Sequence, residues 1–445
     1  MICIIIILTL LRQYRIDPMS ELKKVLIVTY YWPPAGGPAI QRTLKFVKYM
    51  RFFGWEPVIL TVENGEYPAI DPSLIQEIPD NIQVYKTKAF QPFQLYRMLT
   101  GKKGNTHNNA NVFGQKDKTF IERLAKWIRL NLFIPDARIG WYAYAVKAAK
   151  KIIEQEHIDL IYSSSPPHSL QLIAQKIAKQ NKIKWVADFR DPWSELVHYQ
   201  SYKRTWLTRK IDSHFEKSVF RSADRLIAAA NDYATCIKTH VDRKIEVIYN
   251  GYDPSDFPKP KSRNTEDFLI TYTGELSEDR IPHALLRALS RLEHSNIKLQ
   301  FIGNTCPELK QEIQQLNLGN KVMLKPYMPH IASIAELQQS DLLLLVINQV
   351  ANGKGIVPGK IFEYLGTRKP ILCLGDPTGE AGEIIKTTNS GFCIAHHNEE
   401  EIFILLSRLS SGVLPGLSFQ TEQFERKNET GQLCDIFNTL VNKPS

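Results

Sequence analysis

Glycines and cations that could hold a phosphorylated ligand lie close together in the second half of the chain. A predicted strand ends at Gly274, Glu275 follows it, and Arg280 comes six residues after the glycine. A glycine at a strand end lets a ligand approach the backbone, and a nearby guanidinium binds phosphate oxygens through paired hydrogen bonds. The pattern therefore indicates a diphosphate site.

A second segment, residues 353–366, is a glycine-rich loop that leads into a predicted helix. The helix is expected to begin near Gly359, which leaves Lys360 and Ile361 in its first turn, where helix N–H groups favour an anion. Glu363 follows on the same turn, where its carboxylate could accept hydrogen bonds from two ribose hydroxyls. The alternative for Glu363 is a charge that only complements the helix dipole.

In the first half, a glycine pair separates a predicted strand from a predicted helix. Gly36 and Gly37 lie between residues 24–31 and 39–53. The pair would let the same phosphorylated ligand that is expected at Gly274 approach the backbone beside a helix N-terminus. Its spacing is not the G-x-G-x-x-G of dinucleotide-binding loops, and a tight turn without a ligand is an equal alternative.

Polar side chains also follow two further strands of the first half. His168 comes after strand 159–165, where the start of the next helix would lower the pKa of its imidazole and keep it neutral. Asp188 and Arg190 lie near the end of strand 184–191, and charges buried there must be paired, as they often are in active sites. Helix capping by His168 and a structural Asp–Arg pair are the alternatives.

These side chains need strands that alternate with helices to position them. The predicted strands are 24–31, 56–62, 82–88, 159–165, 184–191, 225–230, 246–250, 268–274, 298–303, 321–326, 342–347, 370–375 and 391–396. Amphipathic helices between apolar strands predict α/β domains, each a doubly wound, Rossmann-like parallel sheet. Ligands of such sheets bind beyond the carboxyl ends of the strands, here facing an interdomain cleft.

A proline-rich polar stretch near residues 253–267 divides the chain into domains. The expected divisions are an upstream extension at 1–18, a first domain at 19–255, a second domain at 256–425 and a closing helix at 426–445. The apolar run at residues 2–11 is half the length of a spanning helix and lacks the flanks of a signal peptide. We therefore favour Met19 as the natural start, with a short membrane-dipping anchor as the alternative.

Composition excludes several protein classes. The chain has 445 residues, of which 43% are hydrophobic and 23% charged, values that exclude a disordered chain, a collagen or a polytopic membrane protein. Its six cysteines include no Cys-x-x-Cys pair, which argues against a disulfide scaffold or a zinc ribbon and favours a reducing cytoplasm. No metal-ligand cluster stands out, so we expect neither a metal nor a cofactor. The net charge of +10 predicts an anionic partner.

Much of that charge lies in a long insertion at residues 90–135. Residues 97–130 hold eight Lys or Arg and two Asp or Glu, a net charge of +6. The apolar residues that recur there at helical spacing are Phe120, Ile121, Leu124, Trp127, Ile128 and Leu132. A basic amphipathic helix of this kind, at 117–133, suits an anionic membrane surface, and a helix packed on its own domain is the alternative. Nucleic-acid binding is disfavoured because no recognition motif accompanies the charge.

The motifs follow an order that resembles a known family. The glycine pair comes first, followed by NGYD at 250–253, YTGEL at 272–276, PGKIFEYLG at 358–366 and KPI at 369–371. Together, over residues 24–440, they resemble the retaining GT-B glycosyltransferases of the family-four type. SSSPPHS at 163–169 and VADFRDPW at 186–193 resemble a bacterial subgroup of surface-polysaccharide assembly.

The resemblance implies two Rossmann-like domains, the first binding the acceptor and the second a nucleotide-diphosphate sugar. Glu363 matches the second glutamate of the family's E-x7-E motif, which holds the ribose, and Gly355 stands where the first glutamate contacts the sugar. The family binds the diphosphate through two cations, whose positions are occupied here by Glu275 and Arg280. Only the second position therefore keeps a cation. Lys360, Lys354 or Arg190 would supply the missing positive charge. His168 lies near the family's catalytic-region histidine.

The implied reaction is a metal-independent, retaining transfer of a sugar to a hydroxyl of a saccharide or lipid-linked saccharide. Arg280 and Lys360 would stabilise the departing diphosphate, while His168 and Asp188 would orient the acceptor or sugar. The expected location is the cytoplasm, with peripheral attachment to the inner membrane face. The alternatives are a catalytically silent nucleotide-sugar-binding subunit and a GT-B sugar-nucleotide epimerase.

Overall fold

The structure is a computed structural model. It describes residues 22–63, 65–91, 120–193, 204–258, 263, 266–292, 295–350, 353–413 and 416–441. The expected extension at 1–18 and most of the insertion therefore lie outside the described residues. The chain forms two compact units: the first holds the chain up to Ala229, Tyr233–Ile248 and the chain end from Glu429, and the second holds Ala230–Asp232 and Tyr249–Asn428.

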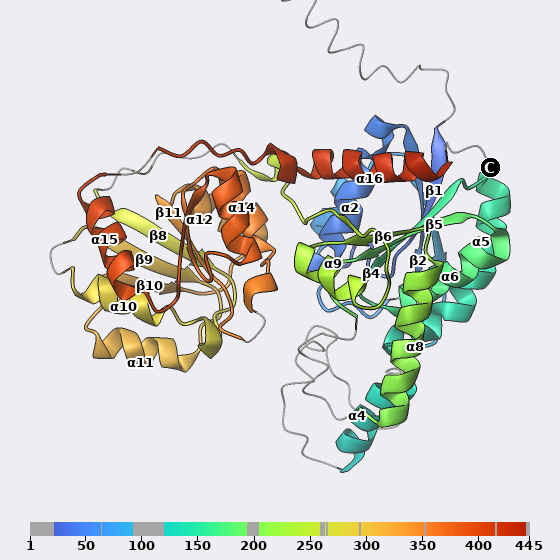
Figure 1. Ribbon diagram of the computed structural model, residues 1–445, viewed down its shortest axis with the longest axis horizontal. Coiled ribbons are helices and arrows are strands. Elements are labelled where there is room, and N and C mark those ends of the chain that lie inside the picture. Colours follow the sequence, from blue (N-terminus) through green and yellow to red (C-terminus); the bar gives the residue numbers. More distant parts are fainter. Residues whose placement is uncertain are drawn as a thin grey trace, which may run out of the picture. The chain divides into compact units, whose positions relative to one another are not determined.

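The first unit is a parallel sheet with helices on both faces (Figure 1). Its seven strands lie in the order β3-β2-β1-β4-β5-β6-β7. They are β1 (Lys23–Val28), β2 (Trp55–Val62), β3 (Gln83–Thr87), β4 (Leu160–Ser165), β5 (Lys184–Phe189), β6 (Arg225–Ala228) and β7 (Glu246–Val247). The α-helices are α2 (Pro38–Met50), α4 (Phe120–Leu132), α5 (Tyr142–Glu156), α6 (Ser169–Asn181), α8 (Trp206–Ser222), α9 (Asn231–Lys238) and α16 (Arg426–Val441).

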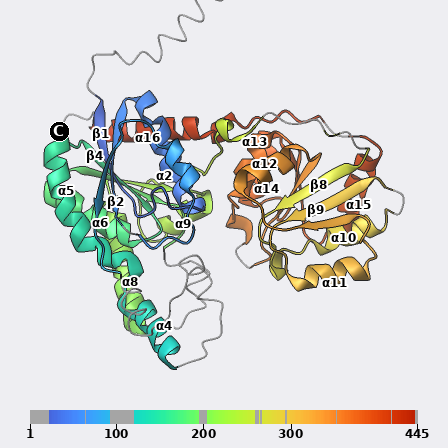
Figure 2. The same cartoon turned by 180° about the vertical axis from the view of Figure 1, so that it is seen from behind.

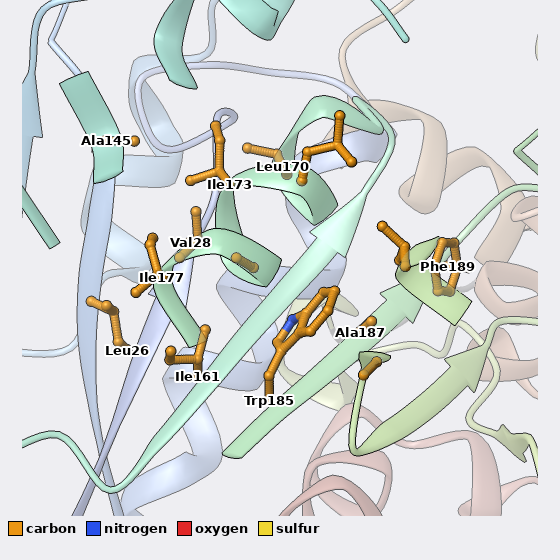
Figure 3. Close-up of a cluster of buried hydrophobic side chains, with 14 of the residues drawn as sticks. Leu26, Val28, Ala145, Ile161, Leu170, Ile173, Ile177, Trp185, Ala187 and Phe189 are labelled. Carbon is orange, nitrogen blue, oxygen red and sulfur yellow. The ribbon is translucent and has the colours of Figure 1, made fainter. Parts of the chain in front are cut away.

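Apolar side chains that point alternately to the two faces of this sheet build a hydrophobic core on each face. On one face, Leu26 and Val28 pack with α5, α6 and α8 around Trp185 (Figure 3). On the other face, Val25 and Ile27 pack with α2 and α16. Successive side chains of a strand point to opposite faces, so a strand covered on both sides must be apolar throughout, as this one is.

The second unit repeats this architecture with six parallel strands in the order β10-β9-β8-β11-β12-β13. The strands are β8 (Phe268–Thr273), β9 (Ile297–Ile302), β10 (Val322–Lys325), β11 (Leu342–Val346), β12 (Ile371–Leu374) and β13 (Gly391–Ile394). The helices are α10 (His283–Ser290), α11 (Pro307–Gln315), α12 (His330–Gln338), α13 (Lys360–Thr367), α14 (Glu380–Thr388) and α15 (Glu399–Ser410). Helices α10, α11 and α15 cover one face, and α12, α13 and α14 cover the other.

Two doubly wound parallel sheets confirm the predicted fold class, and every predicted strand is present. The end of the chain adds one feature to the expected closing helix. From Glu429 onward, α16 belongs to the first unit, where Phe437 packs 5.2 Å from the ring centroid of Trp55. The indole N–H of Trp55 also donates to Asn438 at 3.2 Å. None of the described helices has the length and apolar character needed to cross a bilayer.

Candidate functional site

The ends of two neighbouring strands in the second unit are glycines. Gly274 follows β8 with a φ of 110°, and Gly303 follows β9 with a φ of 130°, both in the region that favours glycine. A Cβ on Gly303 would lie 2.4 Å from the carbonyl oxygen of Gly274, and one on Gly274 would lie 2.9 Å from Nζ of Lys360. Only glycine at both positions allows the two strand ends to pack against each other and Lys360 to pack against Gly274.

Lys360 is the first residue of α13 and reaches back to β8. Its Nζ donates to the carbonyl oxygen of Thr273 at 2.6 Å and lies 4.0 Å from the ring centroid of Tyr272. Burial lowers the pKa of Lys360 to about 7, and the positive charge of Arg280 acts in the same direction, while Glu363 opposes it. An anion bound here would stabilise the charged ammonium and raise that pKa.

Arg280 lies next to this lysine, in the short 3-10 helix Glu278–Arg280. Its Nη1 donates to the carbonyl oxygen of Glu275 at 3.1 Å, and the hydroxyl of Tyr272 donates to the same oxygen at 2.8 Å. Its Nε is buried and has no hydrogen-bond partner. An unsatisfied buried donor costs about 1–3 kcal/mol, so a ligand that accepts from Nε would remove a real penalty.

Glu363 lies on the first turn of α13, as predicted, and contacts a residue that sequence reasoning did not find. Its Oε1 lies 3.2 Å from Nε2 of His330, the first residue of α12, and the Glu363 side chain is 39% exposed. Gly359 is exposed at the N-terminus of α13, with open space around it. Ile361 differs from these two residues, because its side chain is fully buried in the core and its N–H donates to the carbonyl oxygen of Pro358 at 3.0 Å.

The structure explains why residue 355 is glycine. A Cβ there would lie 2.1 Å from Cγ of Asp232 and 2.2 Å from its Oδ2. The carboxylate of Asp232 therefore fills the space that a side chain on residue 355 would need. The segment that carries it is held by Glu380, which accepts from the backbone N–H of Asp232 at 3.1 Å.

In the first unit, Asp188 is fully buried at the end of β5 and belongs to a hydrogen-bond network. Arg42 of α2 donates to its two oxygens from Nε at 2.8 Å and from Nη2 at 2.9 Å. The hydroxyls of Tyr162 and Ser164 each donate to Oδ2 at 2.7 Å. Burial alone would raise the pKa of Asp188, but the Arg42 guanidinium and these hydrogen bonds hold it below its usual value.

The partner of Asp188 is thus Arg42, and Arg190 has a different role. Arg190 follows β5 and donates from Nη1 to the carbonyl oxygen of Ala39 and from Nη2 to that of Pro166. Burial lowers the pKa of Arg190. Its guanidinium therefore joins the start of α2 to the turn before α6, whereas the carboxylate of Asp188 is held by Arg42, Tyr162 and Ser164.

His168 occupies the N-cap position of α6, where it was expected. Its Nδ1 lies 3.3 Å from Oγ of Ser165, and its Nε2 is buried without a hydrogen-bond partner. The imidazole stacks on the indole of Trp193, with ring centroids 4.7 Å apart and planes 15° apart. Burial lowers the pKa of His168 to about 3, and the charge of Arg190 adds to this effect, so the ring is neutral at physiological pH.

The glycine pair forms the turn from β1 into α2. Gly36 donates to Ala69 at 2.9 Å, and a Cβ on it would lie 3.1 Å from Cβ of Asp71. Gly37 is exposed at the N-cap of α2 with a φ of 92°, and a Cβ there would meet nothing within 4 Å. The first glycine is needed for packing and the second for the backbone conformation.

Two family models match this chain, one on each half. The model described as Glycosyltransferase Family 4 matches residues 110–256, and the model described as Glycosyl transferases group 1 matches residues 254–411. Together they cover more than half of the sequence. The chain belongs to the family-four glycosyltransferases. This glycosyltransferase has the two-sheet GT-B fold described above.

Solved structures of the same fold resemble the glycosyltransferase over nearly its full length. A glycosyltransferase from Rickettsia africae is 14% identical, covering 96% of this chain and 100% of that one with a TM-score of 0.58. Anabaena HepE in complex with UDP is 14% identical, covering 94% and 100% with a TM-score of 0.59. The lipopolysaccharide outer core galactosyltransferase WaaB is 12% identical, covering 95% and 100% with a TM-score of 0.56. At these identities the likeness shows the fold. The curated proteins include no match to this sequence.

The structure brings together most of the residues singled out in the second unit of the glycosyltransferase: Gly274, Arg280, Lys360 and Glu363. It adds Arg42, Asp232 and His330, none of which carries a local signal in the sequence, because each contacts its partner from another element. No group of three or more His, Cys, Asp or Glu that could hold a metal occurs within the described part of the chain.

Proposed function

We propose that this glycosyltransferase moves a sugar from a nucleotide-diphosphate donor to a hydroxyl of a saccharide or lipid-linked saccharide acceptor. One observation supports the donor most strongly: two cations, Arg280 and Lys360, lie beside the glycine-ended strands of the second unit. The first has a buried N–H without an acceptor, and burial has lowered the pKa of the second. A bound diphosphate would accept a hydrogen bond from Nε of Arg280 and would stabilise the charged form of Lys360. HepE has been solved with UDP and with UDP-glucose, which agrees with this donor class.

The remaining donor contacts follow from the same geometry. The phosphate oxygens would lie beside Gly359, which is exposed at the N-terminus of α13, and beside the strand end at Gly274. Glu363, half-exposed and beside His330, would accept hydrogen bonds from the ribose. Glu275 adds a negative charge near the phosphates but points its side chain to solvent, so its contribution to the site is its carbonyl oxygen, which holds Arg280.

The reaction would proceed by attack of the acceptor hydroxyl on the anomeric carbon. The new bond joins that carbon to the acceptor oxygen, the bond to the β-phosphate oxygen breaks, and the hydroxyl proton passes to the departing phosphate. Arg280 and Lys360 would stabilise the charge that develops on the diphosphate, so that the proposed reaction needs neither a metal nor a cofactor. Retention of the anomeric configuration is proposed from family membership.

The first unit would bind the acceptor at the carboxyl ends of its strands. His168, neutral and with Nε2 unpaired, and Arg190, which fixes the turn before α6, are the groups placed to orient it there. Asp188 would act through Arg42 as a positioning residue, since its carboxylate is already saturated with hydrogen bonds. Gly36 and Gly37 would shape the turn beside them.

The motifs at 163–169 and 186–193 support a place in bacterial cell-surface polysaccharide biosynthesis, at the inner face of the cytoplasmic membrane. A lipid-linked acceptor would require the enzyme to work beside that membrane, and the basic helix predicted at 117–133 would supply the contact. WaaB is described as a lipopolysaccharide outer core galactosyltransferase, which is an activity of the same class.

A catalytically silent nucleotide-sugar-binding subunit is the second candidate, favoured by Gly355 and Glu275 at positions where the family carries Glu and Arg. A sugar-nucleotide epimerase, the other alternative, has the same fold in a putative Listeria enzyme that is 11% identical. Both alternatives bind the donor, so the test must separate binding from transfer.

The test is a thermal-shift screen against UDP-, GDP-, ADP- and dTDP-sugars, followed by measurement of nucleotide diphosphate release with acceptor present. One donor is expected to raise the melting temperature, because a ligand that binds only the folded state stabilises it. Arg280→Ala should abolish the shift, whereas Arg287→Ala, which removes only an exposed pair with Glu399, should keep it. No shift with any donor would refute the proposal, and a shift without release would support the silent subunit.

A further inference from the structure

Helix α4 and the start of α8 form a surface rich in exposed apolar side chains. The end of α4 and the start of α8 lie side by side, away from the sheet of the first unit (Figures 1 and 2). The large apolar side chains exposed there are Leu124 (46%), Trp127 (46%), Leu132 (64%), Trp206 (67%) and Leu207 (57%). We call these five residues and their two helices the α4–α8 tip. Single exposed apolar residues are ordinary, but such a group on neighbouring helices marks an interaction surface.

Hydrogen bonds hold the two helices together. Asn131 near the end of α4 is buried; its side-chain oxygen accepts the backbone N–H of Thr205 at 2.7 Å, and its carbonyl accepts the hydroxyl of Thr208 at 3.2 Å. Thr205 is in turn the N-cap of α8. The apolar residues of both helices are therefore presented as one surface.

The charged residues of the tip favour an anionic partner. Arg123, Arg209 and Lys210 are exposed, and Nζ of Lys210 lies 5.0 Å from the ring centroid of Trp206. The acidic residue of the first turns of α8, Asp212, is buried and paired with Arg204. Tryptophan with lysine and arginine around exposed leucines is the composition of segments that lie at the headgroup level of a bilayer.

We propose that the α4–α8 tip docks on the surface of a membrane that contains anionic lipids. The apolar side chains would enter the headgroup region, and the three cations would contact lipid phosphates. A second copy of the chain fits less well, because two basic surfaces would repel one another. This inference deepens the membrane contact of the proposed function, and it adds α8 to the single helix expected from the sequence.

The tip is tied to the acceptor edge of the first unit at two points. Asp136, four residues after α4, accepts the backbone N–H and the hydroxyl of Ser169 at 2.9 Å each, next to His168. Asp212 of α8 accepts the indole N–H of Trp193 at 2.9 Å, and Trp193 stacks on His168. A docked tip would thus hold the edge that carries His168 close to the membrane. The presentation of a lipid-linked acceptor at that edge rests on the proposed function, whereas the docking itself does not.

Co-sedimentation of the full chain with vesicles tests the docking. The vesicles would contain phosphatidylcholine alone or phosphatidylcholine with phosphatidylglycerol. Binding is expected only with the anionic lipid and should weaken as salt is added. The double variant Trp127→Ser, Trp206→Ser should weaken binding about tenfold or more, because both indoles leave the interface. The double variant Arg209→Glu, Lys210→Glu should weaken it by about tenfold or more through charge.

Matched controls come from the same unit. Phe52→Ser removes an apolar side chain that is 58% exposed away from the tip, and Lys176→Glu reverses an exposed charge on α6. Both should bind vesicles as the wild type does. Binding that survives in the tip variants would overturn the proposal, and so would a change from dimer to monomer in the tryptophan variant on size-exclusion chromatography, since that would identify a second copy as the partner.

The readouts separate this proposal from the proposed function. All tip variants should keep the donor-induced thermal shift, because the donor residues lie in the other unit. If the wild type shows the donor-induced thermal shift but does not bind anionic vesicles, the docking proposal alone is refuted. Vesicle binding without a donor shift would refute the proposed function alone.

Discussion

The guanidinium of Arg280 donates from Nη1 to the carbonyl oxygen of Glu275 and interacts with the hydroxyl of Tyr272, while its buried Nε has no acceptor. Lys360 beside it is charged only in part near neutral pH, because burial lowers its pKa to about 7. Two incompletely satisfied cations next to exposed glycines form an arrangement that costs stability in the absence of a ligand. We infer that the site is built for an anion.

Arg280→Ala should lower kcat/KM about 100-fold or more, because the charge on the leaving diphosphate loses its nearest guanidinium. Steady-state kinetics with the donor selected by the thermal-shift screen would measure this. Arg287→Ala is the control, since its partner Glu399 lies on the surface. A near-normal rate for Arg280→Ala, in a variant that melts as the wild type does, would remove Arg280 from the mechanism.

His168 links the stability of the first unit to pH. Its folded pKa is about 3, below the ordinary value of 6.5, so between these values the unfolded chain binds a proton that the folded chain excludes. The free energy of unfolding should therefore fall as the pH drops below 6.5, by about 2 kcal/mol at pH 5. His168→Phe keeps a ring against Trp193 and does not titrate, so this part of the pH dependence should disappear.

Urea unfolding followed by tryptophan fluorescence at pH 7 and pH 5 measures the difference between the two proteins. All seven tryptophans lie in the first unit, so the signal reports on that unit. Equal losses of stability in the wild type and in His168→Phe would show that the imidazole is not the group responsible.

At the scale of elements, the end of the chain stabilises the start of the fold. Leu433, Cys434 and Phe437 of α16 are buried in the core that also contains Val25 and Trp55. The last helix therefore completes one face of the first sheet, although most of the second unit precedes it in the sequence.

Phe437→Ala should lower the free energy of unfolding of the first unit by about 3–5 kcal/mol, because it leaves a cavity against Trp55 and Tyr162. Tryptophan fluorescence in urea again gives the measurement. Gln432→Ala, an exposed position on the same helix, should change the stability little. A small effect at Phe437 would mean that α16 contributes little to this core.

At the scale of the whole molecule, the proposed function assigns the two substrates to different units. The proposed phosphate-binding cations and the proposed ribose-binding Glu363 belong to Tyr249–Asn428, whereas His168, Arg190 and the α4–α8 tip belong to the first unit. The second unit contains no tryptophan. Unfolding of the two units can therefore be followed by different signals.

A bound nucleoside diphosphate should stabilise the second unit by about 2.7 kcal/mol at a concentration 100 times its Kd. Scanning calorimetry should record a transition that moves to higher temperature, while the transition followed by tryptophan fluorescence stays in place. A fluorescence transition that moves as far as the calorimetric one would contradict the assignment of the donor site to the second unit alone.

The sequence predicts the order of strands and helices and indicates the side chains that we propose bind the donor. Apolar runs with intervening amphipathic helices predict parallel sheets, and Gly274, Arg280, Lys360 and Glu363 lie within a few residues of strand or helix ends that such sheets bring together. These features are local, so the periodicity of neighbouring residues is enough to predict them.

Tertiary structure alone decided which distant side chains pair. Arg42 meets Asp188 across 146 positions of sequence, Asp232 fills the space beside Gly355, and α8 joins α4 in one exposed surface. Each of these contacts links segments that only folding brings together, and none has a spacing or composition that marks its partner. The physical reason is that burial forces a charge or a polar group to find its complement in space, wherever that complement lies in the chain.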